Sequence, residues 1–133
     1  MRVTSTLANI PNHVVRNIGK WIIRETGIKP KYLKSITVKP SRVQRKGWWY
    51  LLDYGKLTIT MLENRTYAIG NTSGYDQLDM LVYLVSWAMF DSVTRYESNA
   101  KPSESRCLRL VNLFKSQKED LTIEWYCPPR SQK

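Results

Sequence analysis

The longest stretch of periodic apolar residues in the chain runs from Tyr75 to Ser98. Leu84, Trp87 and Phe90 widen its apolar face, and a helix that is apolar over most of its circumference is usually covered on several sides. We therefore predict that this segment is a central core helix. The residues that recur at the helical spacing of three and four positions are Leu78, Leu81, Val82, Val85, Ala88, Met89, Val93 and Tyr96.

The same segment is too short and too closely flanked by charge to cross a membrane. Asp79 and Asp91 bracket its uninterrupted apolar run, which falls far below the roughly 20 residues needed to span a bilayer. We therefore expect neither a membrane span nor a membrane partner.

Two further segments have helical periodicity, Asn12 to Gly27 and Ser103 to Lys118. We expect Asn12 to cap the first helix, Gly27 to end it, and Ser103 to cap the second. Residues 121–126 alternate, so they fit either a strand or a continuation of the second helix. The apolar positions expected to face the core are Val14, Ile18, Trp21 and Ile22 in the first segment, and Cys107, Leu108, Val111 and Phe114 in the second.

Short alternating runs predict a small antiparallel sheet of three to four strands. Two of these runs are joined by Asp53-Tyr54-Gly55-Lys56, and the glycine offers the positive φ that a hairpin turn requires. The expected strands are 33–39, 48–52, 57–62 and 66–69, followed by a loop at 70–74.

A length of 133 residues indicates one domain. We predict a single α+β domain over residues 1–133, with 1–11 as an extended lead-in and 128–133 as a flexible tail. The expected architecture is an N-terminal helix, the small antiparallel sheet, the long central helix and a C-terminal helix.

The positive charge of the chain is concentrated in its first third. There are 21 Lys and Arg against 11 Asp and Glu, which gives a net charge of +10. Between Arg16 and Lys46 there are ten of these cations and one acid, Glu25. This asymmetry favours a polyanion or an acidic protein surface as the partner.

The candidate binding residues lie in or just after this basic segment. Arg16, Lys20 and Arg24 share one helix face, where like charges repel unless something anionic meets them. Trp48 and Trp49 follow a basic turn, and an exposed aromatic beside positive charge can stack on a base. Because neighbouring strand residues point to opposite faces, we expect one tryptophan in the core and the other at the surface. The full set predicted to bind nucleic acid or a protein partner is Arg16, Lys20, Arg24, Lys39, Arg42, Arg45, Lys46, Trp48 and Trp49.

The sequence contains no recognisable constellation for catalysis or metal binding. It lacks the Gly-rich nucleotide-binding loops and the GxSxG nucleophile motif. His13 is the single histidine, and Cys107 and Cys127 do not have the CxxC spacing of a metal site. We therefore expect a cytoplasmic protein with reduced thiols, no cofactor, no metal and no enzymatic activity.

Residues 81–86, LVYLVS, form an apolar frame in the predicted central helix, and the window from Trp87 to Asp91 follows it. This frame, with the order helix, strand, hairpin, long helix, second helix over roughly residues 12–118, resembles compact zincin-like domains of the SprT-like or phage type. In that family the long helix carries HExxH. By this resemblance Trp87 would stand at the first histidine, Ala88 at the glutamate and Asp91 at the second histidine. Because zinc needs the two imidazoles and the base must be a carboxylate, the resemblance implies a degenerate domain without peptidase chemistry.

These observations favour a non-enzymatic basic binding protein that contacts nucleic acid or a nucleoprotein complex through its first third. The alternative is a small inhibitor or adaptor, of the kind encoded by phages and mobile elements, that binds a host protein through the same basic surface. The oligomeric state is open at this point.

Overall fold

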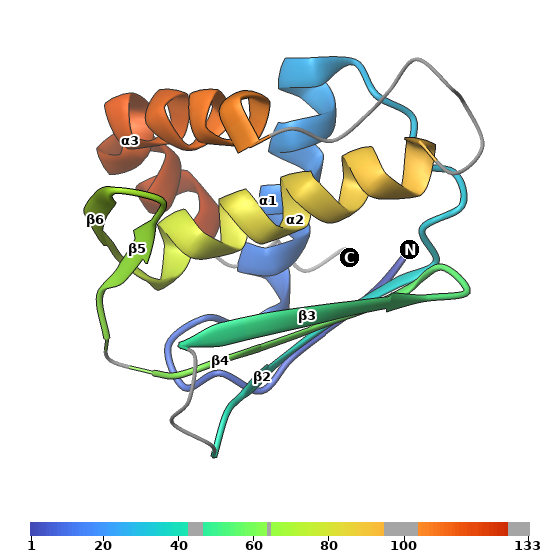
Figure 1. The fold of residues 1–133 in the computed structure, drawn as a ribbon, viewed down its shortest axis with the longest axis horizontal. Coiled ribbons are helices and arrows are strands. Elements are labelled where there is room, and N and C mark those ends of the chain that lie inside the picture. The colour runs from blue at the N-terminus through green and yellow to red at the C-terminus, as the bar shows by residue number, and fades with distance from the viewer. Residues whose placement is uncertain (43–46, 64, 95–103, 128–133) are drawn as a thin grey trace.

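The computed structural model describes residues 1–42, 47–63, 65–94 and 104–127 (Figure 1). The described residues form an α+β fold with three helices and two sheets. The elements in chain order are β1 (Arg2–Ser5), α1 (Asn12–Thr26), β2 (Ser35–Pro40), β3 (Trp48–Asp53), β4 (Lys56–Met61), β5 (Tyr67–Ile69), β6 (Thr72–Tyr75), α2 (Gln77–Thr94) and α3 (Glu104–Tyr126).

The larger sheet has the strand order β1-β2-β4-β3. β1 pairs parallel to β2 and β2 pairs parallel to β4, whereas β3 and β4 are antiparallel. The sheet is therefore mixed, and the predicted antiparallel sheet is wrong. For β1 and β2 the reason is α1 between them, because parallel neighbours need a crossover of a dozen or more residues and a helix usually supplies it. For β2 and β4 the connection contains β3, which pairs on the outer side of β4 and leaves β2 and β4 as parallel neighbours.

The segment predicted as an extended lead-in contains the edge strand β1. Val3 pairs with Ile36 of β2, and it is the one fully buried residue of this four-residue strand. The Ser5 N–H donates to Asn12 Oδ1 at 2.6 Å, so this asparagine ties β1 to α1. Asn12 is therefore not the N-cap that we predicted. Pro11 occupies the N-cap position, and no side chain caps the helix there.

All three helices lie on one side of the four-stranded sheet, and α3 packs on α1 and α2 (Figure 1). α2 contacts β3, α1 and α3, which explains why it is buried over most of its circumference. The predicted central helix is confirmed over Gln77–Thr94, and residues 95–98 lie outside the described part of the chain. The predicted core face of α1 is confirmed as well, since Val14, Ile18, Trp21 and Ile22 are all buried.

α3 continues to Tyr126, so residues 121–126 are helical. Leu121 and Trp125 extend the buried face that begins at Cys107, Val111 and Phe114. The rings of Phe114 and Trp125 are stacked with centroids 5.3 Å apart, and Trp21 of α1 meets both edge-on. The predicted cap of this helix, Ser103, lies outside the described residues.

Two hairpins complete the fold. The predicted β3–β4 turn is confirmed, with Tyr54 at φ 48° and Gly55 at φ 79°. The loop predicted at 70–74 is wrong in part, because residues 72–75 form β6 and pair antiparallel with β5. Threonine, serine and glycine dominate β6, so its sequence lacks the apolar alternation that would have marked it as a strand.

Within the described ranges, no helix combines the length and the apolar character that crossing a membrane requires.

Candidate nucleic-acid interface

The four-stranded sheet has one face packed against the helices and one face that no described helix covers (Figure 1). The helix-facing positions are buried apolar residues such as Ile36, Val38, Leu57 and Ile59. Side chains alternate along each strand, so the remaining positions point to the uncovered side. We call this side the open face, and it comprises Arg2, Thr4, Ser35, Thr37, Lys39, Trp49, Leu51, Asp53, Lys56, Thr58 and Thr60. Thr60 is buried, and the others are exposed or half-buried.

The strand register arranges the open face in rows. Thr60 of β4 is paired with both Lys39 of β2 and Trp49 of β3, so these three residues form one row. Adjacent strands lie about 4.8 Å apart, which separates the Lys39 and Trp49 backbones by about 10 Å. The next row is Thr4, Thr37, Thr58 and Leu51, and the one after it is Arg2, Ser35, Lys56 and Asp53.

Trp49 and Leu51 expose apolar surface on the open face. The exposed fractions are 39% for Trp49 and 62% for Leu51. Trp48, their neighbour in β3, is half-buried and packs against the core from the helix side. The two tryptophans therefore differ in the way that strand alternation predicted, and Trp49 is the one available to a partner.

The charges on the open face are mainly positive. Arg2, Lys39 and Lys56 are exposed and make no ion pair with any residue that the structure describes. Asp53 is the single acid of this face and is paired in register with Lys56. The end of the face that carries Lys39 and Trp49 therefore has positive charge without a nearby acid in its own row.

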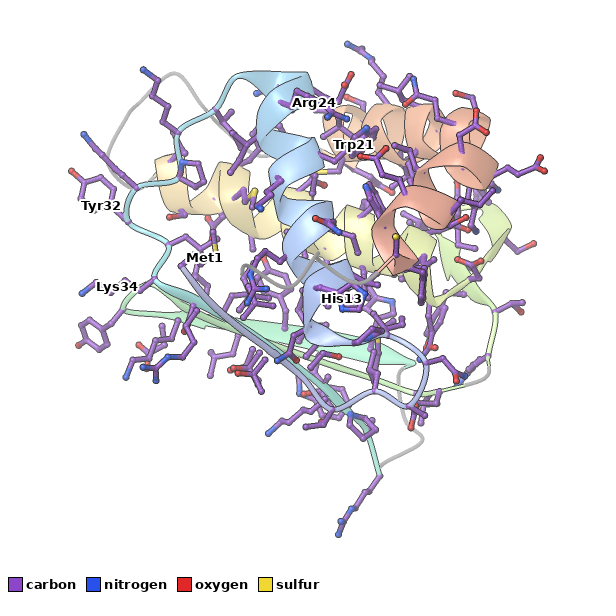
Figure 2. The ribbon with its side chains drawn as sticks, turned by 180° about the vertical axis from the view of Figure 1, so that it is seen from behind. Met1, His13, Trp21, Arg24, Tyr32 and Lys34 are labelled. Atoms are coloured by element: carbon purple, nitrogen blue, oxygen red, sulfur yellow. The ribbon has the colours of Figure 1, made fainter. Side chains whose placement is uncertain are left out.

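The basic stripe of α1 lies on the helix side of the sheet. Arg16, Lys20 and Arg24 are all exposed. Arg24 Nε lies 3.9 Å from Glu25 Oε2, at the end of α1 distant from the sheet (Figure 2). A small cavity of about 190 Å³ brings Arg16 and Lys20 beside Met1 and Val3, so these two cations flank the β1 edge.

The predicted binding residues are thus divided between two surfaces. Lys39 and Trp49 lie on the open face, and Arg42 is exposed just after β2. The stripe of α1 lies on the other side of β1. Arg45 and Lys46 fall outside the described residues. The sequence-based set omitted Arg2, Leu51 and Lys56. Strand alternation within the β3–β4 hairpin was a usable signal for Leu51 and Lys56, whereas Arg2 reaches the open face only by pairing with a strand that is distant in sequence.

A groove of about 660 Å³ lies between the start of β3 and the β5–β6 hairpin. Trp48, Trp49 and Tyr50 line one side of it, and Arg65 and Tyr67 contribute from the other. Its size is within the range of small-ligand sites. Because Trp49 lines the groove and also belongs to the open face, the groove continues that face past β3, the outer strand of the sheet. The sequence gives no signal for it, because β5 and β6 reach this edge only in the folded chain.

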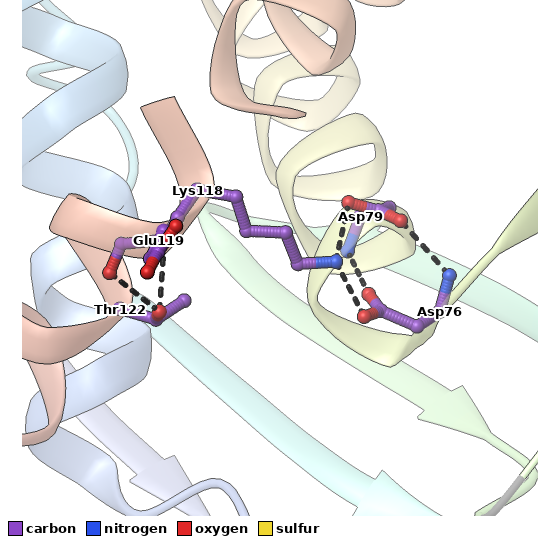
Figure 3. Close-up of polar contacts among 5 residues, drawn as sticks. All are labelled: Asp76, Asp79, Lys118, Glu119 and Thr122. Carbon is purple, nitrogen blue, oxygen red and sulfur yellow. Dashed lines mark hydrogen bonds and ion pairs between the residues drawn. The ribbon is translucent and has the colours of Figure 1, made fainter. Parts of the chain in front are cut away.

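A polar cluster links the start of α2 to α3 (Figure 3). Asp76 Oδ1 accepts the Asp79 N–H at 2.9 Å, and Asp79 Oδ2 accepts the Asp76 N–H at 2.9 Å, which is a reciprocal capping box. Lys118 Nζ donates to Asp76 and, at 3.1 Å, to Asp79 Oδ1. Thr122 donates its hydroxyl to the carbonyl oxygens of Lys118 and Glu119 one turn earlier.

The environment raises the pKa values of Asp79 and Lys118 and lowers the pKa of Asp76. Burial is the largest effect on Asp79 and raises its pKa, and the negative charge of Asp76 adds to this. Burial also acts on Asp76, but hydrogen bonds from Lys118 and the Asp79 backbone outweigh it and lower the pKa of Asp76. Burial alone would lower the pKa of Lys118, and its two carboxylate partners raise it instead. The cluster is satisfied internally, so we interpret it as a helix cap and not as an acid–base site.

The residues considered for catalysis are separated in the fold. Cys107 is fully buried, and burial raises the pKa of its thiol to about 11, so it is protonated at neutral pH. His13 Nε2 lies 3.4 Å from the carbonyl oxygen of Tyr126. In the zincin-like window, Trp87 packs beside Tyr83 and Ala88 is buried. Among the described residues, no three His, Cys, Asp or Glu side chains come together in a way that could hold a metal ion.

No family model, curated protein or solved structure matches the chain.

Proposed function

We propose that this protein is a non-enzymatic binding protein that contacts nucleic acid. The observation that carries the proposal is the row formed by Lys39, Thr60 and Trp49 on the open face. Nucleic acids present phosphates and aromatic bases, and they are bound by surfaces that combine cations with aromatic side chains. Lys39 has no ion-pair partner among the described residues, and Trp49 is 39% exposed, so both remain available to such a ligand.

Additional cations lie close enough to the open face to extend the contact. Arg42 follows the end of β2, two residues after Pro40. At the opposite edge of the sheet, Arg2 belongs to the open face while Arg16 and Lys20 flank the same strand from the helix side. A polymer on the open face would therefore meet positive charge beyond the end of β2 and again beside β1. The proposal assigns these side chains to phosphates, which position a polymer without reading its sequence.

The first test is a fluorescence-anisotropy titration of labelled DNA and RNA at two salt concentrations. We expect the double change Lys39→Gln with Arg42→Gln to weaken binding to every sequence by a similar factor. The slope of log affinity against log salt should become shallower by about 0.7 per lost contact on single strands, or about 0.9 on duplex. The matched control is Arg109→Gln with Lys115→Gln, which removes two exposed cations from α3 and should leave the slope unchanged.

A second candidate function is supported by the apolar residues of the β3–β4 hairpin. Leu51 is 62% exposed and Tyr54 is 86% exposed, a feature that also suits a protein partner. The protein would then act as a small inhibitor or adaptor of the phage or mobile-element type, with its cations facing an acidic surface. If the parent protein binds neither DNA nor RNA below tens of micromolar at low salt, this second function replaces the first.

In both cases we propose a degenerate zincin-like domain without peptidase activity. Trp87 and Ala88 carry no side chain that can bind zinc or act as a base.

A further inference from the structure

We infer that the ligand is a single-stranded nucleic acid lying across the open face, with one base stacked on Trp49 and the next against Leu51. This inference rests on the proposed function and makes it more specific, because it names the form of the polymer and the residues that contact its bases. The phosphates are assigned to Lys39 and, farther across the sheet, to Lys56 and Arg2.

The exposed apolar surface favours single strands over duplex. Trp49 offers a flat aromatic surface and Leu51 an apolar one beside it, and an unstacked base can cover them, whereas in a duplex the faces of the bases are buried against each other. Duplex DNA is usually read by an α-helix or a two-stranded ribbon that enters the major groove. All three described helices lie on the other side of the sheet (Figure 1), so the open face has no helix to insert, and β4 is paired with β2 as well as β3, so the hairpin is not a free two-stranded ribbon.

The spacing of the rows suits consecutive nucleotides. Trp49 and Leu51 are two residues apart on β3, which places their side chains about 7 Å apart along the strand on the same face. The row of Trp49 ends in Lys39 about 10 Å away, so a base on the tryptophan leaves its phosphate within reach of a long cationic side chain. Thr58 and Thr37 continue the row of Leu51, and their hydroxyls can donate and accept hydrogen bonds with sugars or base edges.

The outer edge of β3 extends this path. Trp49 also lines the groove between β3 and the β5–β6 hairpin, and Arg65 lines the same groove. A nucleic-acid strand that leaves the open face over this edge therefore meets Arg65, which is a further exposed cation. Arg65 should consequently contribute to binding of longer oligonucleotides more than of very short ones.

The test compares Trp49→Ala with Tyr32→Ala on a labelled oligothymidylate and on a duplex of equal length. Tyr32 is a matched control, because it is also 39% exposed and has a lysine, Lys31, over its ring, yet it lies outside the sheet (Figure 2). We expect Trp49→Ala to weaken single-strand binding by about 5- to 150-fold and duplex binding by less than about twofold. Tyr32→Ala should change neither. Trp49→Phe should restore most of the loss, since a phenyl ring still stacks.

Three other outcomes would overturn the inference, and they are distinguishable. If the parent binds no nucleic acid, the proposed function fails together with the inference. If the parent binds both polymers and Trp49→Ala weakens them equally or not at all, while Lys39→Gln with Arg42→Gln still flattens the salt slope, the proposed function stands and the stacking inference fails. If light scattering finds a dimer that Leu51→Lys converts to a monomer, a second copy covers the open face instead.

Discussion

Gly55 occupies the turn between β3 and β4 at φ 79°, a backbone conformation that residues with a Cβ rarely adopt. Its carbonyl oxygen accepts the N–H groups of Lys34 at 2.7 Å and Ser35 at 3.3 Å, so the turn is joined to the start of β2. A Cβ added at this position would collide with the backbone carbonyl oxygen of Tyr32. This one residue therefore determines how closely the hairpin approaches the preceding segment.

We predict that Gly55→Ala destabilises the protein more than Gly27→Ala. Gly27 has a similar φ of 71° at the end of α1, but a Cβ there meets no atom within 4 Å. Gly27→Ala should therefore show only the backbone strain, about 1 kcal/mol, whereas Gly55→Ala adds a clash that the backbone must move to relieve. Urea denaturation measures both changes. Equal losses in free energy of unfolding would mean that the turn does not pack against Tyr32 as described.

At the scale of the elements, the last two turns of α3 are the informative case. Leu121, Ile123 and Trp125 would share one face if residues 121–126 were a strand, because strand side chains alternate. In α3 they do not, since Leu121 and Trp125 are buried while Ile123 is 70% exposed. The ring of Trp125 packs against Phe114, which also belongs to α3, and against Trp21 of α1.

This difference gives a direct prediction. Trp125→Ala should lower the free energy of unfolding by about 3–5 kcal/mol, because it opens a cavity in a close-packed aromatic cluster. Ile123→Ala should change it by less than about 0.5 kcal/mol, as is usual for a surface position. Thermal melts followed by circular dichroism can compare the two variants with the parent. Similar destabilisation by both would indicate that 121–126 do not continue α3.

At the scale of the whole molecule, Lys118 joins segments that are about 40 residues apart in sequence. It bridges the cap of α2 to the middle of α3 through Asp76 and Asp79 (Figure 3). The Asp79 side chain is 2% exposed, whereas those of Lys118 and Asp76 are 28% and 50% exposed. The contribution of these ion pairs to stability therefore depends chiefly on keeping the Lys118 cation beside the buried Asp79 carboxylate.

We predict that Lys118→Met destabilises the protein at pH 7 by about 2 kcal/mol or more, because the buried Asp79 charge loses its cation. Without Lys118 the pKa of Asp79 in the folded state rises further above its unfolded value. A raised folded-state pKa means that the folded state binds the proton more tightly, so stability increases as the pH falls through that pKa. The deficit of Lys118→Met should therefore shrink between pH 7 and about pH 5.

Arg109→Met, a change at an exposed cation of the same helix, serves as the control for this prediction. Its effect on the free energy of unfolding should be small and nearly independent of pH over the same range. Urea denaturation at both pH values provides the comparison. A deficit of Lys118→Met that stays constant or grows on acidification would contradict the assignment of the buried charge to Asp79.

The amino-acid sequence by itself determined the features that depend on neighbouring residues. Helical spacing of apolar side chains marked α1 and α2, and Gly27 and Gly55 marked the end of α1 and the β3–β4 turn. Strand alternation predicted that Trp48 and Trp49 would face opposite sides. These features are local, because a helical turn or a tight hairpin is formed by contacts between residues that are close in sequence.

Only the tertiary structure decided which strands are neighbours and which of their faces is covered. β1 has a single buried side chain, and β6 lacks the alternation of apolar and polar residues that is typical of strands. Both segments are strands because their backbones pair with β2 and β5. The parallel pairs β1–β2 and β2–β4 join distant parts of the chain, and they place Arg2 and Lys39 on the same face as Trp49 of the β3–β4 hairpin. α3 likewise continues past Lys118 because Trp21 and Phe114 surround Trp125. Such contacts depend on burial between remote segments, for which the local order of apolar and polar residues holds no information.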